Sequence, residues 1–496
     1  MSDLVLAIDQ GTTGSTIALM DAEGRLLTSV NHEFPQIFPQ PGWVEHDLES
    51  IWESVEKGLS AVFADGKYAA TDISAIGITN QRETTALWDA ETGKAVHNAI
   101  VWQCRRTTDV CEKLKTDGLE ALVKARSGLV LDPYFSATKF KWLLDYAPEA
   151  QPLLAQGRLR AGTIDSYLIW RLSAGQAHKT DVSNASRTSL MALDSLSWDD
   201  ELLSVFGVPK EILPEICPSS GRFAVTRGVA GLPDGLPISG VAGDQQSALF
   251  GQACFAVGDA KCTFGTGSFI LMNAGDTPVA SDSGLLSTVA WQLEGQPAVY
   301  ALEGGAFVCG AAVQWLRDQL GIIQSAPEVE ALAKTVDNSG GVEFVPALAG
   351  LGAPYWAPEA RGTLTGLTRG SGRGEIARAT LDAMALQNVD ILRAMEKDIG
   401  STMQSLKVDG GASANNFLMQ LQADYLARPI TRPEVIETTV AGACFLAGLG
   451  EGVWDSPSEV ANVWRSDCSF DVGMTDAARD QRMASWQSAV AKALLN

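Results

Sequence analysis

The stretch LVLAIDQGTTGSTIALM, residues 4–20, decides the fold class of this chain. Its first five residues form an apolar run of strand length, and residues 16–20 form a second strand. Between them lies a turn rich in glycine and threonine at residues 9–15. Glycine lets a backbone approach a ligand closely, and threonine hydroxyls and backbone amides are donors that suit phosphate oxygens. The stretch therefore predicts a strand hairpin whose turn can hold a phosphate.

A second hairpin of the same plan lies in the other half of the chain. The run KCTFGTGSFILM at residues 261–272 again places a glycine–threonine turn between two strands. Residues 406–409 form a short strand that meets Gly410 and Gly411, a pair that suits close packing against a ribose or adenine. The hairpins are a weak repeat in sequence but a suggestive one in organisation. Together they predict two domains that grip a nucleotide from opposite sides.

The rest of the chain alternates strand and helix signals, which indicates α/β architecture. Residues 47–64 have apolar positions at helical spacing and predict a helix, with Asp47 as its N-cap. The length of 496 residues favours two or three domains. We place a boundary near residues 245–255 and expect one domain over residues 1–252 and another over residues 253–496.

Charge and composition exclude several classes of function. The chain has 37 Lys and Arg against 59 Asp and Glu, a net charge of −22, so it repels phosphate backbones and anionic headgroups. We therefore expect no nucleic acid and no membrane as partners. There is no apolar run of membrane-spanning length and no secretion signal, so we expect a cytoplasmic location. The eight cysteines lack metal-ligand spacing and are expected to be free thiols, mostly buried.

Carboxylates at strand ends are the candidate chemical groups. Asp9 ends the first strand, where a hard oxygen ligand suits Mg²⁺. Asp244 ends the apolar strand at residues 237–242, where it suits the base that accepts a proton from an attacking hydroxyl in phosphoryl transfer. The alternative for Asp244 is a helix N-cap. The chain has no P-loop motif and no GxGxxG motif after its first strand.

Arg82 and Glu83 directly follow a predicted buried strand. A buried cation and anion need partners, and a polyhydroxylated substrate would supply them; the alternative is an ordinary surface ion pair. Trp102, Tyr134 and Phe269 are aromatic residues near strand ends or glycine turns. They suit the CH face of a small polyol, with core packing as the alternative.

Longer strings make the chain resemble the FGGY family of carbohydrate kinases over about residues 4–490. One family signature is similar to YFSATKFKWL at residues 134–143, and the other to segments within residues 362–382. Further similar strings are DQGTT (9–13), ITNQRETT (78–85), NAIVWQCRRT (98–107), GTIDSYLIW (162–170), TDVSNASRT (180–188), GDQQSALFGQ (243–252), FVPALAGLGAPYWAPEARG (344–362) and VDGGASANNFLMQ (408–420). The resemblance implies an α/β, two-domain, actin-like (ribonuclease-H-like) ATPase fold with the active site in the interdomain cleft.

The resemblance also implies an activity: phosphorylation of glycerol by ATP, with Mg²⁺ as cofactor, in a homo-oligomer that is a dimer or tetramer. It makes Asp244 the general base and places Asp9 beside the metal. The implied glycerol positions are Arg82, Glu83, Trp102, Tyr134, Asp244, Gln245 and Phe269. The implied nucleotide positions are Thr12, Thr13, Gly14, Thr16, Thr266, Gly310, Gln314, Gly411 and Asn415. The alternatives are another polyol or sugar kinase of the same family and a non-enzymatic actin-like ATPase.

Two departures from the family pattern affect these expectations. Where members commonly have an arginine facing the phosphates, this chain has Thr16, which predicts weaker ATP or product binding and leaves a catalytically silent relative open. Many members also carry an arginine-containing loop through which fructose 1,6-bisphosphate inhibits them. The corresponding residues 231–236 contain no arginine and include Asp234, so we expect weak or absent inhibition by that sugar.

Overall fold

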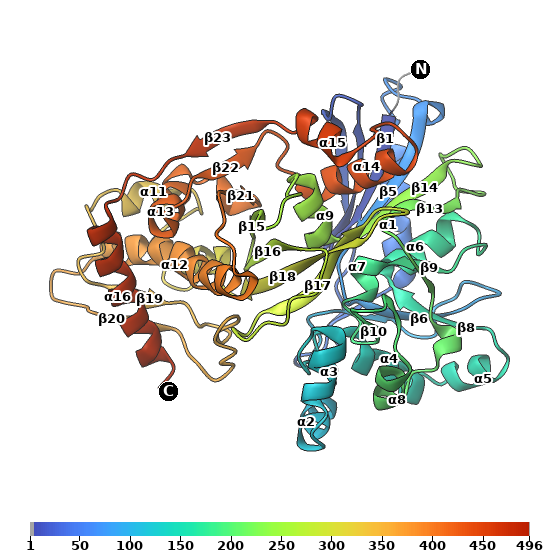
Figure 1. The fold of residues 1–496 in the computed structure, drawn as a ribbon, viewed down its shortest axis with the longest axis horizontal. Helices are drawn as coiled ribbons and strands as arrows, with labels where there is room; N and C mark the ends of the chain where they lie inside the picture. The colour runs from blue at the N-terminus through green and yellow to red at the C-terminus, as the bar shows by residue number, and fades with distance from the viewer. Residues whose placement is uncertain (1–3, 496) are drawn as a thin grey trace.

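The computed structural model describes residues 4–495, which form two lobes joined at a central junction (Figure 1). The first lobe has a six-stranded sheet in the order β13-β14-β5-β1-β2-β3, and the second a seven-stranded sheet in the order β17-β18-β16-β15-β21-β22-β23. The strands of the first sheet are β1 (Leu4–Gln10), β2 (Gly14–Met20), β3 (Leu26–Glu33), β5 (Ile73–Asn80), β13 (Ser220–Val225) and β14 (Pro237–Gly243). Those of the second are β15 (Ala260–Phe264), β16 (Ser268–Gly275), β17 (Leu286–Gln292), β18 (Ala298–Ala306), β21 (Leu406–Asp409), β22 (Ile430–Pro433) and β23 (Ser466–Phe470).

Smaller sheets and sixteen helices complete the described part of the chain. The minor strands are β4 (Glu45–His46), β6 (Thr85–Asp89), β7 (Ala99–Ile100), β8 (Leu159–Thr163), β9 (Lys179–Asp181), β10 (Met191–Ala192), β11 (Ser197–Trp198), β12 (Glu215–Cys217), β19 (Glu343–Val345) and β20 (Thr363–Thr365). The helices are α1 (Leu48–Val62), α2 (Thr108–Thr116), α3 (Glu120–Ser127), α4 (Ser136–Tyr146), α5 (Ala150–Ala155), α6 (Ile164–Leu172), α7 (Val182–Ala185), α8 (Asp200–Phe206), α9 (Asp244–Gly251), α10 (Gly310–Asp318), α11 (Glu328–Ala333), α12 (Arg373–Ile399), α13 (Asn416–Leu426), α14 (Thr438–Gly450), α15 (Pro457–Val463) and α16 (Asp476–Ala493).

The two large sheets contain the same arrangement of five strands. In the first sheet, β1 pairs antiparallel with β2 and β2 with β3, while β5 and then β14 extend the other edge in parallel. In the second sheet, β15, β16, β18, β21 and β22 repeat this arrangement in the same senses. The repeat in organisation predicted from the two hairpins is therefore confirmed, and it extends from the hairpins to whole sheets.

Helices α9 and α14 cross where the lobes meet. At Gly251 and Gly442 a side chain would collide with backbone carbonyls of the other helix, those of Thr438 and Ser247, so glycine is required for this close approach. Helix α14 comes from the second half of the chain but packs its apolar residues, including Val440, against the first sheet. The crossing thus fixes the strand ends of the two sheets relative to each other.

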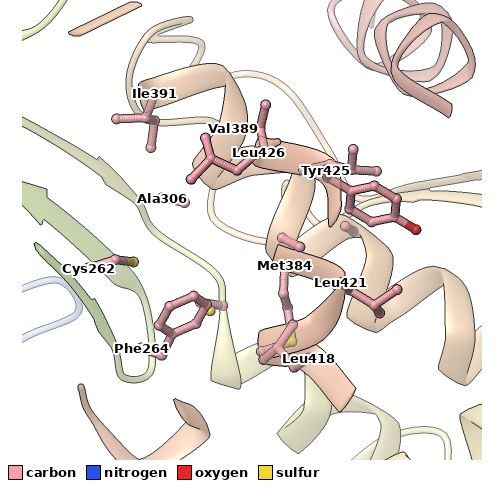
Figure 2. Packing of buried hydrophobic residues seen from close by; sticks show 14 of the residues in the cluster. Cys262, Phe264, Ala306, Met384, Val389, Ile391, Leu418, Leu421, Tyr425 and Leu426 are labelled. Atoms are coloured by element: carbon pink, nitrogen blue, oxygen red, sulfur yellow. The ribbon is translucent and has the colours of Figure 1, made fainter. Parts of the chain in front are cut away.

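The core of the second lobe is an apolar layer between its sheet and the helices α12 and α13 (Figure 2). Phe264 at the end of β15 lies in this layer together with Met384 of α12 and Leu418 of α13, and all three are almost fully buried. Burial of such side chains is worth about 1.5–3 kcal/mol each. The packing holds the second sheet rigidly behind its hairpin turn.

Several predicted local features are confirmed. Helix α1 begins at Leu48, and the Asp47 carboxylate caps it by accepting a hydrogen bond from the Ser50 amide at 2.9 Å. All eight cysteines are unpaired, and six are buried. After the predicted strand at residues 406–409, a short 3₁₀ turn over Gly411–Ala414 leads into α13, which begins at Asn416. No helix within residues 4–495 is long and apolar enough to cross a membrane.

Candidate functional site

Candidate residues meet where two parallel strands of the first sheet end. Strand β5 ends just before Gln81 and continues into Arg82 and Glu83, and β14 is followed at once by Asp244. Because β5 and β14 are parallel neighbours, their carboxyl ends lie at the same edge of the sheet. The Arg82 Nε atom lies 3.1 Å from Asp244 Oδ1. The fold thus places the predicted base beside the predicted polyol-binding pair.

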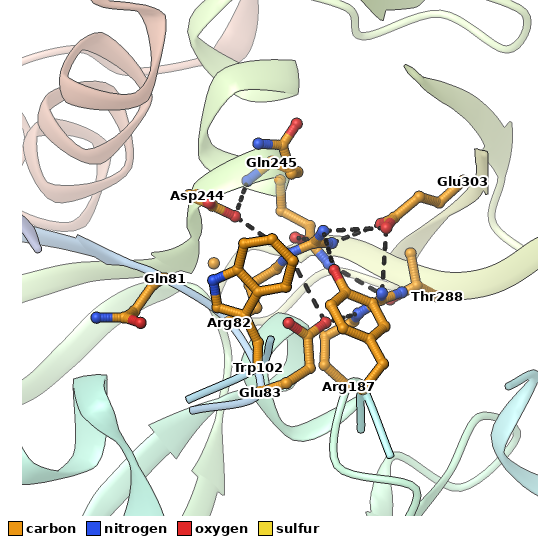
Figure 3. Close-up of polar contacts among 12 residues, drawn as sticks. Gln81, Arg82, Glu83, Trp102, Arg187, Asp244, Gln245, Thr288 and Glu303 are labelled. Carbon is orange, nitrogen blue, oxygen red and sulfur yellow. Dashed lines mark hydrogen bonds and ion pairs between the residues drawn. The ribbon is translucent and has the colours of Figure 1, made fainter. Parts of the chain in front are cut away.

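Arg82 and Glu83 are almost fully buried, so the alternative of a surface ion pair is wrong. Arg82 donates to both carboxylate oxygens of Glu303, at 2.5 and 3.0 Å (Figure 3). Arg187 donates from Nε to Glu83 at 2.6 Å and from Nη2 to Glu303 at 3.1 Å. Two cations and two anions therefore neutralise each other inside the protein, which offsets the cost of removing them from water.

The pKa values in this network follow from burial and pairing. Burial alone would raise the pKa of the Glu303 carboxyl, but Arg187 and Arg82 outweigh it and lower that pKa to about 2. Burial raises the pKa of Glu83 despite the neighbouring arginines. Glu83 also adopts a left-handed backbone conformation with φ of 58°, which costs a non-glycine residue about 1–3 kcal/mol. Strain at a buried charged residue is typical of functional sites.

Arg187 and Glu303 are site residues that the sequence alone does not predict. Glu303 carried a usable signal, because it is the sole charged residue in the otherwise uncharged strand β18. A charge in a buried strand requires a partner. Arg187 lies within one of the family-like strings but far from Glu83 in sequence, so its role depended on knowing how α7 packs at the junction.

Asp244 is the first residue of α9, and the N-cap of that helix is Gly243, so the alternative of a helix N-cap is wrong. Its Oδ1 accepts a hydrogen bond from the backbone amide of Gln245 at 2.7 Å. The Asp244 side chain is 33% exposed, whereas Arg82 beside it is only 2% exposed. Asp244 is therefore the more accessible member of the pair.

The predicted aromatic residues are partly buried. The rings of Trp102 and Tyr134 lie edge to face with centroids 5.6 Å apart, and the Tyr134 hydroxyl accepts from Arg82 at 3.4 Å. Trp102 Nε1 donates to Thr12 Oγ1 at 3.1 Å, which connects the first hairpin turn to the site. Phe269 of β16 lies opposite Gly305, so it shares a sheet face with Glu303, two residues away on β18.

The first hairpin turn is held by its own backbone and by β3. The Gly11 amide donates to the Gly14 carbonyl at 2.9 Å, and an added Cβ at Gly14 would lie 2.9 Å from the His32 carbonyl oxygen. Thr13 is exposed at the turn. Thr16 lies directly opposite Asp9 in the hairpin and accepts from Asn31 at 2.9 Å. Thr16, where the family resemblance implies an arginine, therefore lies beside Asp9, the candidate metal ligand.

The second hairpin turn is contacted by the start of α10. The amides of Cys309 and Ala311 donate to the Thr266 carbonyl at 2.8 and 3.0 Å, and the Gly310 amide donates to the Gly265 carbonyl at 3.0 Å. A Cβ at Gly310 would lie 2.6 Å from that Gly265 oxygen. The turn and the helix therefore touch through backbone, and Thr266 itself remains exposed.

The other predicted nucleotide positions lie around this turn or on the helices beside it. Gly410 has φ of 83°, and an added Cβ would lie 2.6 Å from the Phe264 carbonyl oxygen, just before the turn. Gly411 follows it and is exposed. Gln314 is exposed on α10. Asn415 is the N-cap of α13, where its side-chain oxygen accepts from the Leu418 amide at 2.9 Å.

Adjacent threonines at the start of α14 connect the two sheets. Thr439 donates to Asp9 at the end of β1 at 2.7 Å, and Thr438 donates to Asp409 at the end of β21 at 2.8 Å. Burial raises the pKa of Asp9 to about 6; the Thr439 hydrogen bond opposes this shift, and the charge of Asp244 adds to it. Within residues 4–495 no three His, Cys, Asp or Glu residues form a metal-binding group.

In the loop at residues 231–236, the Asp234 carboxylate accepts a hydrogen bond from the Gly228 amide at 2.7 Å. This contact gives Asp234 a role in shaping its own loop. Weak or absent inhibition by fructose 1,6-bisphosphate stays a prediction.

Comparisons with known proteins agree with the fold. Residues 4–251 match the N-terminal domain of the FGGY family of carbohydrate kinases, and residues 260–451 match its C-terminal domain. These two matches define a kinase of the actin-like ATPase fold. The chain belongs to the FGGY family of carbohydrate kinases.

Individual relatives are similar over the whole chain. A glycerol kinase of Bdellovibrio bacteriovorus is 58% identical over 490 residues, which cover 99% of each chain. The crystal structure of Plasmodium falciparum glycerol kinase with ADP is 34% identical and superposes with a TM-score of 0.94 over 100% of this chain and 99% of that one. A gluconate kinase of Lactobacillus acidophilus, 22% identical, superposes with a TM-score of 0.87 over 99% of this chain and 97% of that one, and shares the fold alone.

Proposed function

We propose that this chain transfers the γ-phosphate of ATP to glycerol, giving sn-glycerol 3-phosphate and ADP. The observation that carries the proposal is the buried Arg82–Glu83 pair beside the accessible carboxylate of Asp244. A donor and two acceptors at one small site match a polyol, whose hydroxyls both donate and accept. The similarity to glycerol kinases over the full chain selects glycerol among the polyols.

In this proposal, Asp244 accepts the proton of one glycerol hydroxyl. The oxygen of that hydroxyl attacks the γ-phosphorus of ATP, and the bond between the γ-phosphorus and the oxygen that bridges it to the β-phosphate breaks. Arg82 donates to the hydroxyls and Glu83 accepts from them. The remaining proposed glycerol contacts are Trp102, Tyr134, Gln245 and Phe269. The aromatic side chains among them would pack on the carbon atoms and help to exclude water from the reaction.

ATP would lie between the two hairpin turns. The proposed nucleotide contacts are Thr12, Thr13, Gly14, Thr16, Thr266, Gly310, Gln314, Gly411 and Asn415. Asp9 would hold Mg²⁺, directly or through water, because Mg²⁺ binds through one or two carboxylates together with substrate phosphates. When bound, Mg²⁺ neutralises charge on the phosphates. We also propose that residues 1–252 and 253–496 are the two domains, although residues 1–3 and 496 lie outside the described part. A cytoplasmic homo-oligomer completes the proposal.

An assay of ADP release with a panel of substrates tests the proposal. Glycerol should give a far higher kcat/KM than erythritol, xylulose or ribulose, and ADP release without any polyol should be slow. A higher kcat/KM with a ketose would make the chain a different sugar kinase of the family. ADP release that does not depend on polyol would identify an actin-like ATPase, and no turnover with any substrate would identify a silent relative.

A further inference from the structure

A buried lysine of the second lobe contacts the side chain of Gln245. Lys261 lies on β15 and is fully buried. Its Nζ atom donates to Gln245 Oε1 across the junction and to Thr263 Oγ1 at 2.8 Å on its own strand. Gln245 lies directly after Asp244 at the start of α9 and beside it in Figure 3.

The chemistry of lysine decides which way the Gln245 amide is turned. A lysine ammonium has three donors and no acceptor, so the Gln245 oxygen must face Lys261. The Gln245 Nε2 atom then points away from the lysine, and within residues 4–495 no protein acceptor bonds to it. Gln245 is 8% exposed, so a small part of its surface stays open. Its free end is therefore a hydrogen-bond donor.

A chain of hydrogen bonds holds Lys261 in this position. Because Lys261 donates to Thr263, the Thr263 hydroxyl is free to donate to Asp409, and it does so at 2.5 Å. The other oxygen of Asp409 accepts from Gln252, which directly follows α9, and from Thr438 of α14, each at 2.8 Å. In this series of hydrogen bonds the lysine ammonium can only donate and the Asp409 carboxylate can only accept, so each hydroxyl or amide between them must donate toward Asp409. The lysine is thus fixed by elements of both lobes.

Burial limits what Lys261 itself can do. Its full burial behind Gln245 leaves no surface for a substrate or a phosphate to contact. Burial also lowers the pKa of its ammonium, an effect that the Asp409 carboxylate opposes. Lys261 is therefore a positioning residue and not a catalytic one.

We propose that Lys261 makes Gln245 an obligatory hydrogen-bond donor to a substrate hydroxyl oxygen next to the one that Asp244 deprotonates. This inference rests on the proposed function and deepens it. A substrate without an acceptor oxygen at that position would leave the Gln245 amide unpaired in a largely buried site, which weakens binding. Lys261 thus contributes to selection of a substrate with neighbouring hydroxyls.

A double-mutant cycle in the ADP-release assay tests this inference. Lys261→Met, which has no donor, should raise the KM for glycerol about tenfold, the effect of one lost hydrogen bond. The KM for ATP and kcat should stay within about threefold of wild type. Gln245→Ala should raise the glycerol KM similarly, and the double variant should show no further increase, because Lys261 acts only through Gln245.

The control is Lys407→Met. Lys407 is the direct register partner of Lys261 on β21, but its ammonium donates to the carbonyls of Gln252 and Ala253 and contacts no proposed substrate residue. Its loss should lower the melting temperature without raising the KM for glycerol. An equal rise in KM in the control, or additive effects of Lys261→Met and Gln245→Ala, would overturn the inference.

Gln245→Glu keeps the test decisive if Lys261→Met does not fold. This variant keeps a partner for Lys261 and replaces the free donor by an acceptor, so the glycerol KM should again rise about tenfold. An unchanged KM would overturn the inference. The wild-type chain in the same assay separates the two claims, since wild type without glycerol-dependent turnover refutes the proposed function instead.

Discussion

The two large sheets share one strand arrangement but differ in the chemistry at their strand ends. In the first sheet, Asp9 lies near the end of β1, and β5 and β14 are followed by Arg82 and Asp244. In the second sheet, β21 ends in Asp409, a buried carboxylate already bonded to three side chains, and the residues that follow β15 and β21 are Gly265 and Gly410. One end thus offers proton acceptors and cations, and the other offers backbone that a flat or anionic ligand can approach closely.

This difference shows what the repeated fold supplies and what it leaves to individual residues. The fold brings strand ends to one edge in each lobe and joins the edges through α14, whose Thr438 and Thr439 bond to a carboxylate of each sheet. The residues at the ends then divide the work between polyol chemistry and nucleotide binding. Variants at equivalent strand ends should therefore affect different substrates.

The largest expected effect is at Asp244. Asp244→Asn removes the proposed base while keeping the shape of the side chain, so kcat should fall by about 10²–10⁴-fold, the usual contribution of a general base. Glycerol binding, measured by calorimetry, should change only a few-fold, and the KM for ATP should not change. Near-normal turnover would show that Asp244 is not the base, and the assignment of polyol chemistry to the first sheet would then lose its main support.

Much of this contrast could be predicted from the sequence, because strand ends are local features. Apolar runs followed by Asp9, Arg82 and Asp244 were sufficient to single out these residues. Pairings across the junction could not be predicted in this way. Glu303 and Lys261 depend on the register of β18 and β15 and on how the second sheet faces α9, and these follow from long-range packing. The available signal in the sequence was that Lys261 and Glu303 are each the single charged residue of an otherwise uncharged strand, because a buried charge requires a partner.

The second strongest effect is expected at the glycine end of β21. Gly410→Ala places a methyl group against the Phe264 carbonyl and forces alanine into a conformation that suits glycine alone, with φ of 83° and ψ of 162°. Such strain costs about 1–3 kcal/mol, so the melting temperature should fall and the KM for ATP should rise.

Gly400→Ala is the matched control, because Gly400 at the end of α12 also has a left-handed φ of 70° but no atom lies within 4 Å of its added Cβ, and it is not a proposed nucleotide contact. It should lower the melting temperature and leave the KM for ATP unchanged. If Gly410→Ala raised the KM for glycerol and left that for ATP unchanged, the assignment of the second sheet to the nucleotide would be wrong.

A smaller effect is expected from the protonation of Asp9, whose pKa is raised to about 6. A metal ligand must be deprotonated, so the apparent affinity for Mg²⁺ should fall up to tenfold per pH unit below about pH 6. Thr439→Val removes the hydrogen bond that lowers this pKa, so the loss should begin at a higher pH. Kinetic titrations with Mg²⁺ at several pH values measure both effects.

The sign of the stability effect differs from that of the activity effect. Because the folded pKa of Asp9 lies above the ordinary value of 3.8, the folded state binds this proton more tightly, and the contribution to stability rises as pH falls from about 6 to 3.8. A lower apparent affinity for Mg²⁺ in acid would therefore not result from unfolding caused by the protonation of Asp9. An identical pH dependence in Thr439→Val would contradict the assignment of the metal to Asp9.

The smallest effect is expected at Thr16, where the family resemblance implies an arginine. Thr16 lies opposite Asp9 and is partly exposed, so Thr16→Arg would add a cation beside the proposed phosphate turn. An exposed charge contributes up to about 1 kcal/mol, so the KM for ATP should fall about two- to fivefold at low salt, and less at high salt. Thr16→Gln adds length without charge and should change little. A lower KM for glycerol and not for ATP would contradict the proposal that ATP lies between the two hairpin turns, because the first hairpin would then serve the polyol and not the nucleotide.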